Sequence, residues 1–523
     1  MTESRPGSGG RRGRQARLTV RSQAQQKRAR VVWPGLEGGI YKPLSQRDVE
    51  RIHEGALRIL AGVGMGGATP EIIELARAKG LEVTDDQRIR FPAAYIDDVV
   101  AGAGRNFILY GRDRAHDLDI SGSKVHYGTA GAAVSVPDFE TGKYRESRLL
   151  DIYDFGRLVD RLPNIHWFGR TVVPTELEGG ETMDVNIVYA AAAATQKHVA
   201  AGFTCAEGIY AAVQLFDMIL GGEGRFAEQP CCSVYCTGVV PPLRYGELSL
   251  DVAVAAARVG MPVDFIIAAQ AGATAPASLA GALVQTTAEG LGGVALVNLV
   301  KPGHPTIFSN WPFASDLRTG SFSGGGPEEA LLNAASAQIA NFYDLPSGVA
   351  CSMTDSKLPD AQSGYEKAMT SLLTGLSGAN LIHEAAGMQA SLLGCSHEAL
   401  VIDSEMLGNA LRAVRGIEVT DETLSVEVIE EVVKGAGHFL GHEQTLTLME
   451  TEYIYPDLGD RERPVTWEER GSLDIRARAH ERVREILSSH YPEYIDPAVD
   501  AKIRDAFDIR LAPEALKPGG GRW

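Results

Sequence analysis

Short apolar runs alternate with helical segments roughly every 30 to 40 residues through the middle of the chain. This alternation is typical of βα units, in which helices join the strands of a parallel sheet. Two of the intervening helices are plain, at 210–220 and at 278–299, and Pro302 and Gly303 end the second one. Predicted strands span 165–173, 198–203, 232–237, 263–269, 306–310, 348–353 and 380–383.

An eighth strand would close these units into a barrel, and either 399–403 or 125–136 supplies it. A doubly wound open sheet usually carries a glycine-rich fingerprint after its first strand, and this chain has none. We therefore predict an α/β fold: a TIM (β/α)8 barrel with an N-terminal helical layer and a C-terminal helical extension.

The chain divides into four predicted parts. Residues 1–31 form a disordered basic arm, with nine Lys or Arg against one Glu. An arm lying on an acidic neighbouring subunit or partner is the alternative, and nucleic-acid binding comes third. Residues 32–150 form an N-terminal helical layer with a small sheet, and 151–415 form the barrel catalytic core. Residues 416–523 form a C-terminal helical extension packed on the barrel.

Composition excludes several classes of protein. The formal net charge of the 523 residues is -17, so nucleic-acid binding has no global electrostatic support. Because no stretch approaches 18 uninterrupted apolar residues, we expect no membrane span. The charged N-terminus lacks the apolar core of a secretory signal. Six cysteines in this length do not resemble a disulfide framework, so we expect a cytoplasmic protein.

The stretch 349–378 is predicted to form a strand, then a polar loop at the mouth of the barrel, then a helix. Its apolar start is followed at once by small and polar residues, including Ser352 and Asp355. A capping box, Ser363-x-x-Glu366, is predicted to begin the helix. In an α/β barrel the turn after a strand is where the chemistry lies.

Other predicted strand ends carry aromatic and neutral polar residues. Phe203, Tyr235 and Trp311 supply aromatic rings there, while Gln270 and His383 supply polar groups. Aromatic faces attract quaternary ammonium, and a few polar groups anchor the other end of a ligand. A small cationic ligand therefore fits, although for His383 a satisfied core histidine is the alternative.

Three further patterns favour structural interpretations. Cys231, Cys232 and Cys236 share one predicted strand without zinc-like spacing, so we read them as buried small side chains. Glycines interrupt the segment that holds His438 and His442, and we predict no metal site. The glycine run ending at 326 opens a helix whose acidic first turn disfavours phosphate. From the residues alone, the prediction is a barrel enzyme that binds a small ligand.

Motifs along nearly the whole chain resemble the trimethylamine methyltransferase family, the corrinoid-dependent methylamine and quaternary-amine methyltransferases. They include Thr354-Asp-Ser-Lys357, Asp360-x-Gln-x-Gly-Tyr-Glu366 and Gly378-Ala-Asn-Leu-Ile382. The resemblance implies a TIM barrel and a methylated amine as methyl donor. It also implies that the acceptor is the Co(I) of a corrinoid (cobalamin) supplied by a separate protein, with no cofactor bound permanently.

One departure places the chain within the family. Members that act on trimethylamine carry pyrrolysine close to the position of 351–353, where this sequence has Cys, Ser and Met. A quaternary amine leaves as a neutral tertiary amine and needs less activation than trimethylamine. The chain therefore resembles the non-pyrrolysine branch, whose substrates are glycine betaine and related betaines.

Under this interpretation Phe203, Tyr235 and Trp311 form an ammonium cage, and Gln270 and His383 hold the polar end of the substrate. The catalytic candidates are Ser352, Asp355 and His383. Ser352, Met353 and Gly325 form the mouth that faces the corrinoid, which Asp355 helps to shape. We also expect a homo-oligomer.

Two other functions remain open. One is a barrel lyase or hydrolase acting on a small carboxylate, with His383 or Asp355 as base. The other is a non-catalytic amine-binding homologue that keeps the barrel but has lost methyl transfer.

Overall fold

The structure is a computed structural model that describes residues 30–519 and 522–523. The chain forms two compact units. The larger unit contains Pro34–Val414 and Asp457–Trp523, and the smaller contains Arg415–Pro456 with the described residues before Pro34. Apart from its last two residues, the predicted basic arm at 1–31 lies outside the described residues.

A curled nine-stranded sheet organises the larger unit. Eight of its strands are parallel: the seven from β7 to β18 lie side by side in chain order, and β4, the first in the chain, pairs with β18. Strand β1 (Leu36–Glu37) adds to β4 in the antiparallel sense. The parallel strands are β4 (Lys124–Tyr127), β7 (Phe168–Gly169), β8 (Val199–Ala201), β9 (Cys232–Thr237), β12 (Val263–Ile267), β14 (Thr306–Asn310), β17 (Ser347–Ala350) and β18 (Leu381–His383).

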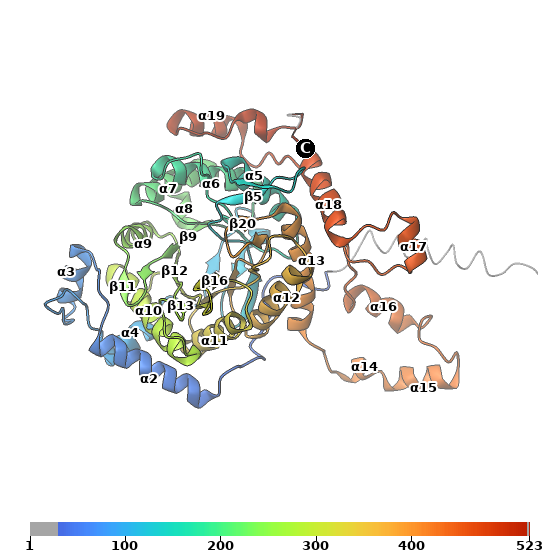
Figure 1. Cartoon of the computed structure of the whole chain (residues 1–523), viewed down its shortest axis with the longest axis horizontal. Coiled ribbons are helices and arrows are strands. Elements are labelled where there is room, and N and C mark those ends of the chain that lie inside the picture. Colours follow the sequence, from blue (N-terminus) through green and yellow to red (C-terminus); the bar gives the residue numbers. More distant parts are fainter. Residues whose placement is uncertain (1–29, 520–521) are drawn as a thin grey trace, which may run out of the picture. The chain divides into compact units, whose positions relative to one another are not determined.

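A helix follows each parallel strand, and Figure 1 shows these helices arranged around the strands. They are α5 (Leu149–Arg161), α6 (Glu181–Ala194), α7 (Ala206–Leu220), α9 (Glu247–Val259), α10 (Leu279–Val300), α11 (Pro327–Tyr343), α12 (Ala361–Leu376) and α13 (His397–Arg415). Gly128, just after β4, forms a parallel bridge with Trp167, just before β7, so the two ends of the parallel run meet. The α/β class with a curled parallel sheet is confirmed, and complete closure into a barrel stays a proposal.

Local signals in the sequence explain several helix ends. The Ser278 side chain caps α10 by accepting a hydrogen bond from the Gly281 amide, and Pro327 is the first residue of α11, as predicted. Helices α7 and α9 end at Gly221 and Gly260, which have positive φ. Helix α10 is long and apolar enough to cross a membrane, but 83% of its apolar window is buried within the protein.

Small elements cover the sheet at its edges. The predicted N-terminal helices are present as α2 (Gln46–Gly62), α3 (Pro70–Ala78) and α4 (Ala93–Gly102), all of which contact α10. Beyond the carboxyl ends of the parallel strands lie two small sheets. One contains β13 (Gln270–Ala271), β15 (Phe313–Asp316) and β16 (Ser321–Ser323), and the other contains β19 (Met388–Gln389), β20 (Gly394–Cys395), β5 (Ser135–Pro137) and β6 (Tyr144–Glu146). Two-stranded pairs are β2 (Ile108–Leu109) with β3 (Leu118–Asp119) and β10 (Val239–Val240) with β11 (Arg244–Tyr245).

Two sequence predictions were wrong in detail. Residues 399–403 lie inside α13 and form no strand, whereas β4, within 125–136 apart from its first residue, occupies the place beside β18. The N-cap of α12 is Asp360, whose carboxylate accepts from the Ser363 amide. Glu366, predicted to complete a capping box, instead accepts from the Thr354 hydroxyl and the Asp355 amide.

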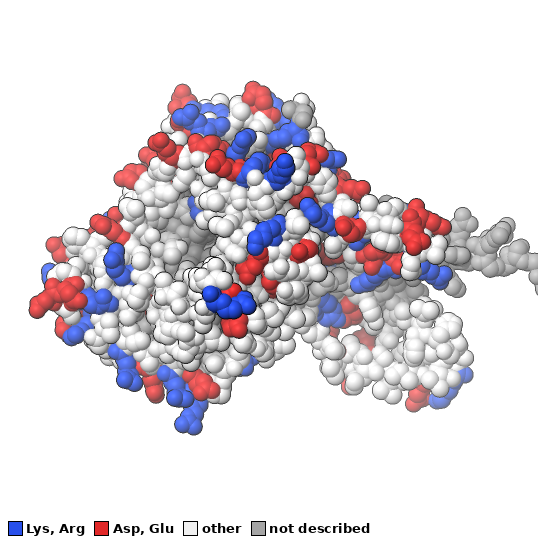
Figure 2. Space-filling view, in the orientation of Figure 1, with Lys and Arg blue, Asp and Glu red and all other residues white. Residues whose placement is uncertain are grey.

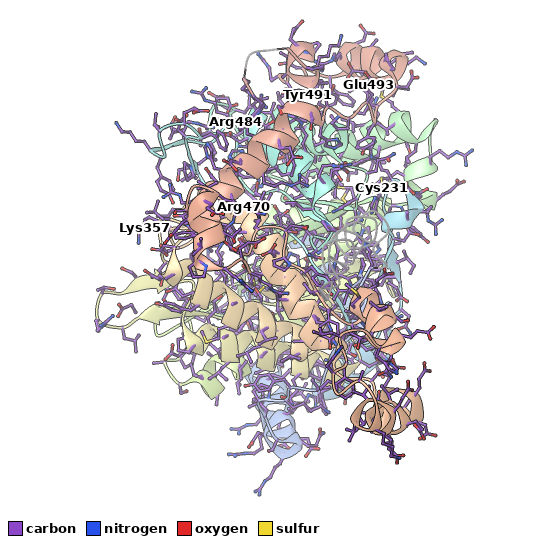
Figure 3. All side chains as sticks on the ribbon, turned by 90° about the vertical axis from the view of Figure 1, so that its right-hand side faces the viewer. Cys231, Lys357, Arg470, Arg484, Tyr491 and Glu493 are labelled. Atoms are coloured by element: carbon purple, nitrogen blue, oxygen red, sulfur yellow. The ribbon has the colours of Figure 1, made fainter. Side chains whose placement is uncertain are left out.

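The C-terminal part of the larger unit is helical, with α17 (Pro464–Glu469), α18 (Ile475–Ser489) and α19 (Pro497–Ala506). Helix α18 lies against α5, and Figure 3 labels Arg484 on it and Tyr491 just beyond it. The Tyr491 ring lies 4.0 Å from the guanidinium carbon of the buried Arg157 of α5. The smaller unit holds α14 (Asp421–Leu424), α15 (Val426–Lys434) and α16 (Glu443–Thr451). The four-part division of the chain stays a prediction, although β4 places part of 32–150 in the main sheet.

Candidate active site

The candidate site lies where the carboxyl ends of the parallel strands converge. Tyr235 of β9 and Asp264 of β12 are register partners, as are Ala350 of β17 and His383 of β18. Partners on neighbouring parallel strands project from the same face of the sheet, so these positions point toward a common centre. Figure 2 shows that the surface is hollowed near the middle of the ring of helices.

His383 is the centre of an aromatic cluster. Its side chain is fully buried, and its ring centroid lies 4.7 Å from that of Trp167 and 4.6 Å from that of Trp311. The Nε2 atom lies 2.8 Å from Oδ2 of Asp264, although the two groups are not aligned for a hydrogen bond. A buried imidazole between two indoles therefore stands beside a buried carboxylate.

Many polar atoms around this cluster have no hydrogen-bond partner within the described protein. They are Oδ1 of Asp264, Nε1 of Trp311, both oxygens of Glu329, Oγ of Ser352, Oε2 of Glu384 and Nε of Arg170. Since buried polar groups are nearly always hydrogen-bonded, such a concentration indicates a place where a polar or charged ligand binds.

Two buried carboxyl groups at the site have raised pKa values. Burial raises the pKa of Glu384 to about 8, against the opposing effect of the Arg170 charge. Burial, followed by the nearby charges of Asp355, Glu384 and Glu366, raises the pKa of Glu329 well above its usual value. Both groups therefore bind protons tightly in the free protein, and a cation between them would favour their ionised forms.

The loop after β17 carries three of the predicted mouth residues. Ser352 is buried with a φ of 57°, and its amide donates to the Thr370 hydroxyl. Met353 is fully buried. The Asp355 carboxylate accepts hydrogen bonds from the Gly324 amide at 2.9 Å and from the hydroxyls of Ser323 at 3.0 Å and Ser391 at 2.7 Å.

Gly325, also predicted at the mouth, lies against the Glu366 side chain. A Cβ atom there would lie 2.6 Å from the carboxyl carbon of Glu366, which leaves no room for a larger residue. Together with Asp355, this contact joins the loop before α11 to the loop before α12.

The predicted substrate-binding residues differ in how closely they lie to the His383 cluster. Trp311 and His383 are in contact, and Tyr235 is the register partner of Asp264. The Tyr235 hydroxyl donates to the Arg170 carbonyl at 3.0 Å. Phe203 and Gln270 are half-buried after β8 and β12, and among the described residues no ring contact or side-chain hydrogen bond links them to the His383 cluster.

Sequence reasoning missed five residues that border the site: Trp167, Arg170, Asp264, Glu329 and Glu384. A charged residue within an apolar run, as Asp264 is, was an available signal. Glu329 was read only as an acidic residue that would repel phosphate, whereas it is fully buried.

The cysteine and histidine motifs lie outside the site. All six cysteines are free thiols, and Cys231, Cys232 and Cys236 are buried, as predicted. Burial raises the pKa of the Cys231 thiol to about 12. His442 caps α16 through Nδ1, which accepts from the Gln444 amide. Over residues 30–519 and 522–523, no group of three or more His, Cys, Asp or Glu is placed to hold a metal ion.

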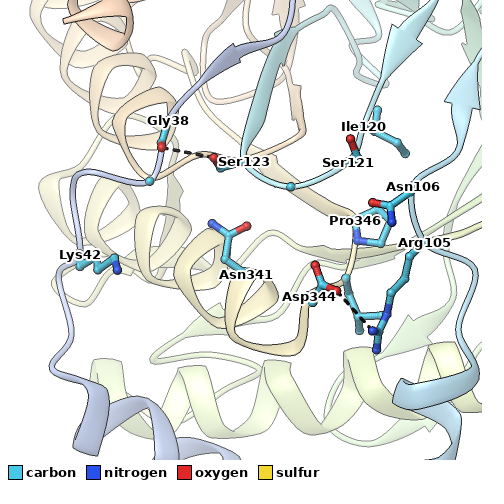
Figure 4. A pocket seen from close by; sticks show the side chains of 13 residues that line it. Gly38, Lys42, Arg105, Asn106, Ile120, Ser121, Ser123, Asn341, Asp344 and Pro346 are labelled. Carbon is cyan, nitrogen blue, oxygen red and sulfur yellow. Dashed lines mark hydrogen bonds and ion pairs between the residues drawn. The ribbon is translucent and has the colours of Figure 1, made fainter.

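A separate pocket of about 320 Å³ lies at the opposite, amino end of the strands. Figure 4 shows it between Ser121 and Ser123 near the start of β4 and Pro346 before β17, with Arg105 paired to Asp344 at 3.3 Å. Ligands of parallel α/β sheets bind at the carboxyl ends of the strands. We therefore place the active site at the His383 cluster.

These features define an α/β protein with a buried aromatic and acidic site at the carboxyl ends of its parallel strands. The family model for trimethylamine methyltransferase (MTTB) matches residues 10–513. The chain belongs to this family, as its motifs indicated.

Named relatives cover most of the chain. Glycine betaine methyltransferase from Desulfitobacterium hafniense (strain Y51) is 31% identical over 465 residues, which is 89% of this chain and 96% of that protein. Trimethylamine methyltransferase MttB from Methanosarcina thermophila is 32% identical over 456 residues, covering 86% of this chain and 94% of that one. The crystal structure of the monomethylamine methyltransferase MtmB from Methanosarcina barkeri aligns with a TM-score of 0.46 at 13% identity, over 90% of this chain and 96% of that one.

Proposed function

We propose that this protein transfers a methyl group from a quaternary amine, glycine betaine or a related betaine, to the Co(I) of a separate corrinoid protein, without pyrrolysine. The observation that carries the proposal is the cluster of His383, Trp311 and Trp167 beside the buried carboxylate of Asp264. Indole faces and carboxylates both attract a cation that has no N–H group to donate. Family membership supports methyl transfer as the reaction.

The reaction needs positioning more than acid–base chemistry. The C–N bond breaks with its electron pair left on nitrogen, so a neutral tertiary amine leaves. Co(I) supplies the electron pair of the new Co–C bond, and the product is methyl-Co(III). The protein has to hold nitrogen, methyl and cobalt in line and exclude water, and such positioning can supply most of the catalysis.

We assign the residue roles by the same reasoning. Trp311 and Tyr235, with Phe203 at the rim, form the ammonium cage, and Gln270 and His383 hold the polar end of the substrate. Hydrogen bonds around Asp355 hold the mouth that faces the corrinoid.

The mouth itself consists of Ser352, Met353 and Gly325. No pyrrolysine is encoded at 351–353, where Cys, Ser and Met stand. A quaternary donor suits that sequence because its leaving group is already activated by its positive charge.

The wider expectations belong to the same proposal. The meeting of β4 and β7 at Gly128 and Trp167 supports a closed (β/α)8 barrel. Six free cysteines fit a reducing cytoplasm. We further propose that the protein works as a homo-oligomer with a cognate corrinoid protein.

One observation favours a second function. His383 Nε2 lies 2.8 Å from Asp264 Oδ2, close enough for the carboxylate to orient a histidine base once the two groups align. A lyase or hydrolase acting on a small carboxylate would use that pair. Its rate would depend on one essential base, whereas methyl transfer from a quaternary amine to Co(I) would not.

The test is anaerobic and spectroscopic. The purified protein is mixed with a corrinoid protein in the Co(I) state and, one at a time, with trimethylamine, glycine betaine, proline betaine, carnitine, γ-butyrobetaine or choline. Methyl-Co(III) formed with a betaine and not with trimethylamine is the expected result. No methylation by any quaternary amine, with the cognate corrinoid protein present, would overturn the proposal.

A further inference from the structure

Arg170 is a buried cation without an ion-pair partner among the described residues. It directly follows β7 and is 9% exposed. Its Nε has no hydrogen-bond partner, and Nη1 makes only a long bond of 3.5 Å to the Gly202 carbonyl. Two other deeply buried cations are paired: Lys367 with Asp403 at 2.6 Å and Arg157 with Asp154 at 3.0 Å.

Glu384 is the matching unpaired acidic group, which a bound cation would ionise. It follows β18, is 3% exposed and has a strained φ of 59°. Its Oε2 has no hydrogen-bond partner in the described protein. Burial raises the pKa of Glu384, and the nearby Arg170 charge opposes that rise only in part. Among the described side chains, Arg170 and Glu384 form no ion pair within 4.0 Å.

Tyr235 lies near both Arg170 and Glu384. The guanidinium carbon of Arg170 lies 6.0 Å from the Tyr235 ring centroid. The Tyr235 hydroxyl lies 3.5 Å from the Gly131 carbonyl oxygen, and a Cβ built on Gly131 would lie 3.1 Å from Oε2 of Glu384. Arg170 and Glu384 therefore border the same aromatic side chain without forming an ion pair.

We propose that Arg170 and Glu384 bind the two ends of a zwitterion, with the guanidinium holding a carboxylate and Glu384 facing the quaternary ammonium. This assignment rests on the proposed function and names its substrate as a betaine. A guanidinium can bind a carboxylate through two parallel N–H bonds. An ammonium without N–H groups needs only a nearby anion, so Glu384 does not have to align with it.

The pair would also reject plain cations. Choline or trimethylamine lacks a carboxylate and would leave the buried Arg170 charge uncompensated. Selection for the zwitterion then comes from Arg170, and attraction of the ammonium group comes from Glu384.

The test measures equilibrium binding of glycine betaine and of choline by calorimetry, without corrinoid protein. Arg170→Gln should weaken glycine betaine binding by about 30-fold or more and leave choline binding within threefold. Arg170→Lys, which keeps the charge but loses the paired N–H groups, should give an intermediate loss. Glu384→Gln should weaken the binding of both ligands.

Arg318→Gln is the matched control because it removes an arginine from an exposed hairpin, where its side chain is 87% exposed. It should bind both ligands like the wild type. A thermal melt of each variant checks folding, and Arg170→Lys serves if Arg170→Gln is unstable.

The inference is overturned if Arg170→Gln leaves glycine betaine binding unchanged, or weakens both ligands equally. It is also overturned if the wild type binds neither ligand. Methyl transfer is scored separately. Arg170-dependent betaine binding without methyl-Co(III) would defeat the proposed function alone, and betaine-dependent methylation with an unaltered KM in Arg170→Gln would defeat this inference alone.

Discussion

Two buried charged regions of the larger unit are handled in opposite ways. Between α12 and α13, Lys367 and Asp403 form an ion pair at 2.6 Å, and the Gly387 amide donates a further hydrogen bond to Asp403. At the candidate site, Arg170 and Glu384 are also buried but form no such pair among the described side chains. The first arrangement satisfies its charges within the fold, whereas the second leaves charge available for a ligand.

Breaking the ion pair of Lys367 and Asp403 should have the largest effect on stability. Lys367→Met should lower the free energy of unfolding by about 3–5 kcal/mol, because Asp403 would stay buried with no cation beside it. Denaturant unfolding followed by circular dichroism measures the loss. Adding Asp403→Leu should restore only part of it, since the Gly387 amide would then lose its acceptor. A loss below about 1 kcal/mol would show that the pair contributes little.

A substitution at Glu384 should instead raise the free energy of unfolding. Glu384 faces Arg170 from the end of β7, Glu329 from α11, Tyr235 from β9 and Cys395 from β20. Folding raises its pKa from 4.5 to about 8, so its contribution to stability is full below pH 4.5 and is lost as the pH rises toward 8. Glu384→Gln should therefore stabilise the protein by on the order of 3 kcal/mol at pH 7.

Unfolding by denaturant at pH 5 and at pH 7.5 provides the measurement. The stability difference between Glu384→Gln and the wild type should be small at pH 5 and larger at pH 7.5. A difference that does not change with pH would mean that Glu384 is not the titrating group. If Glu384→Gln gains stability and loses betaine binding, then Glu384 serves ligand binding at a cost in stability.

The sequence predicted the scaffold better than the site. The bounds predicted for β9 and β14 agree with the structure, because both are apolar runs between clear breaks. Residues 399–403 were misread because a short apolar run does not distinguish a strand from a buried helix. Asp360 was missed as a cap because Ser363, three residues later, offered an equally plausible signal.

At the candidate site, the rule that chemistry lies at strand ends led to the prediction of Trp311 and His383, which are in contact in the structure. It could not identify Asp264, which lies inside a strand, because its role depends on which strands become neighbours. Nor could it pair Arg170 with Glu384. Arg170 follows β7 at one end of the parallel run, and Glu384 follows β18, which is next to the strand at the other end. Only the curling of the sheet brings β7 beside β4, the neighbour of β18.

A smaller effect is expected from the aromatic part of the site. Trp311→Leu should weaken betaine binding by about 2 kcal/mol, or roughly 30-fold, because a desolvated cation–π contact is lost. Trp311→Phe keeps an aromatic face and should recover part of that affinity. Calorimetry with glycine betaine checks both variants. Equal losses in the two would indicate that Trp311 acts through shape and not through its π system.

The smallest effect is expected from a substitution at Asp355, which tests whether the mouth acts independently of the substrate-binding site. Asp355 accepts three hydrogen bonds that tie the loop after β17 to Ser323, Gly324 and Ser391. Asp355→Asn keeps the size of the side chain and removes its charge, which should loosen the loop by about 1 kcal/mol. We expect the KM for the corrinoid protein to rise about fivefold while the Kd for glycine betaine stays the same. Weaker betaine binding with an unchanged KM for the corrinoid protein would instead assign Asp355 to the substrate-binding site, together with Arg170 and Glu384.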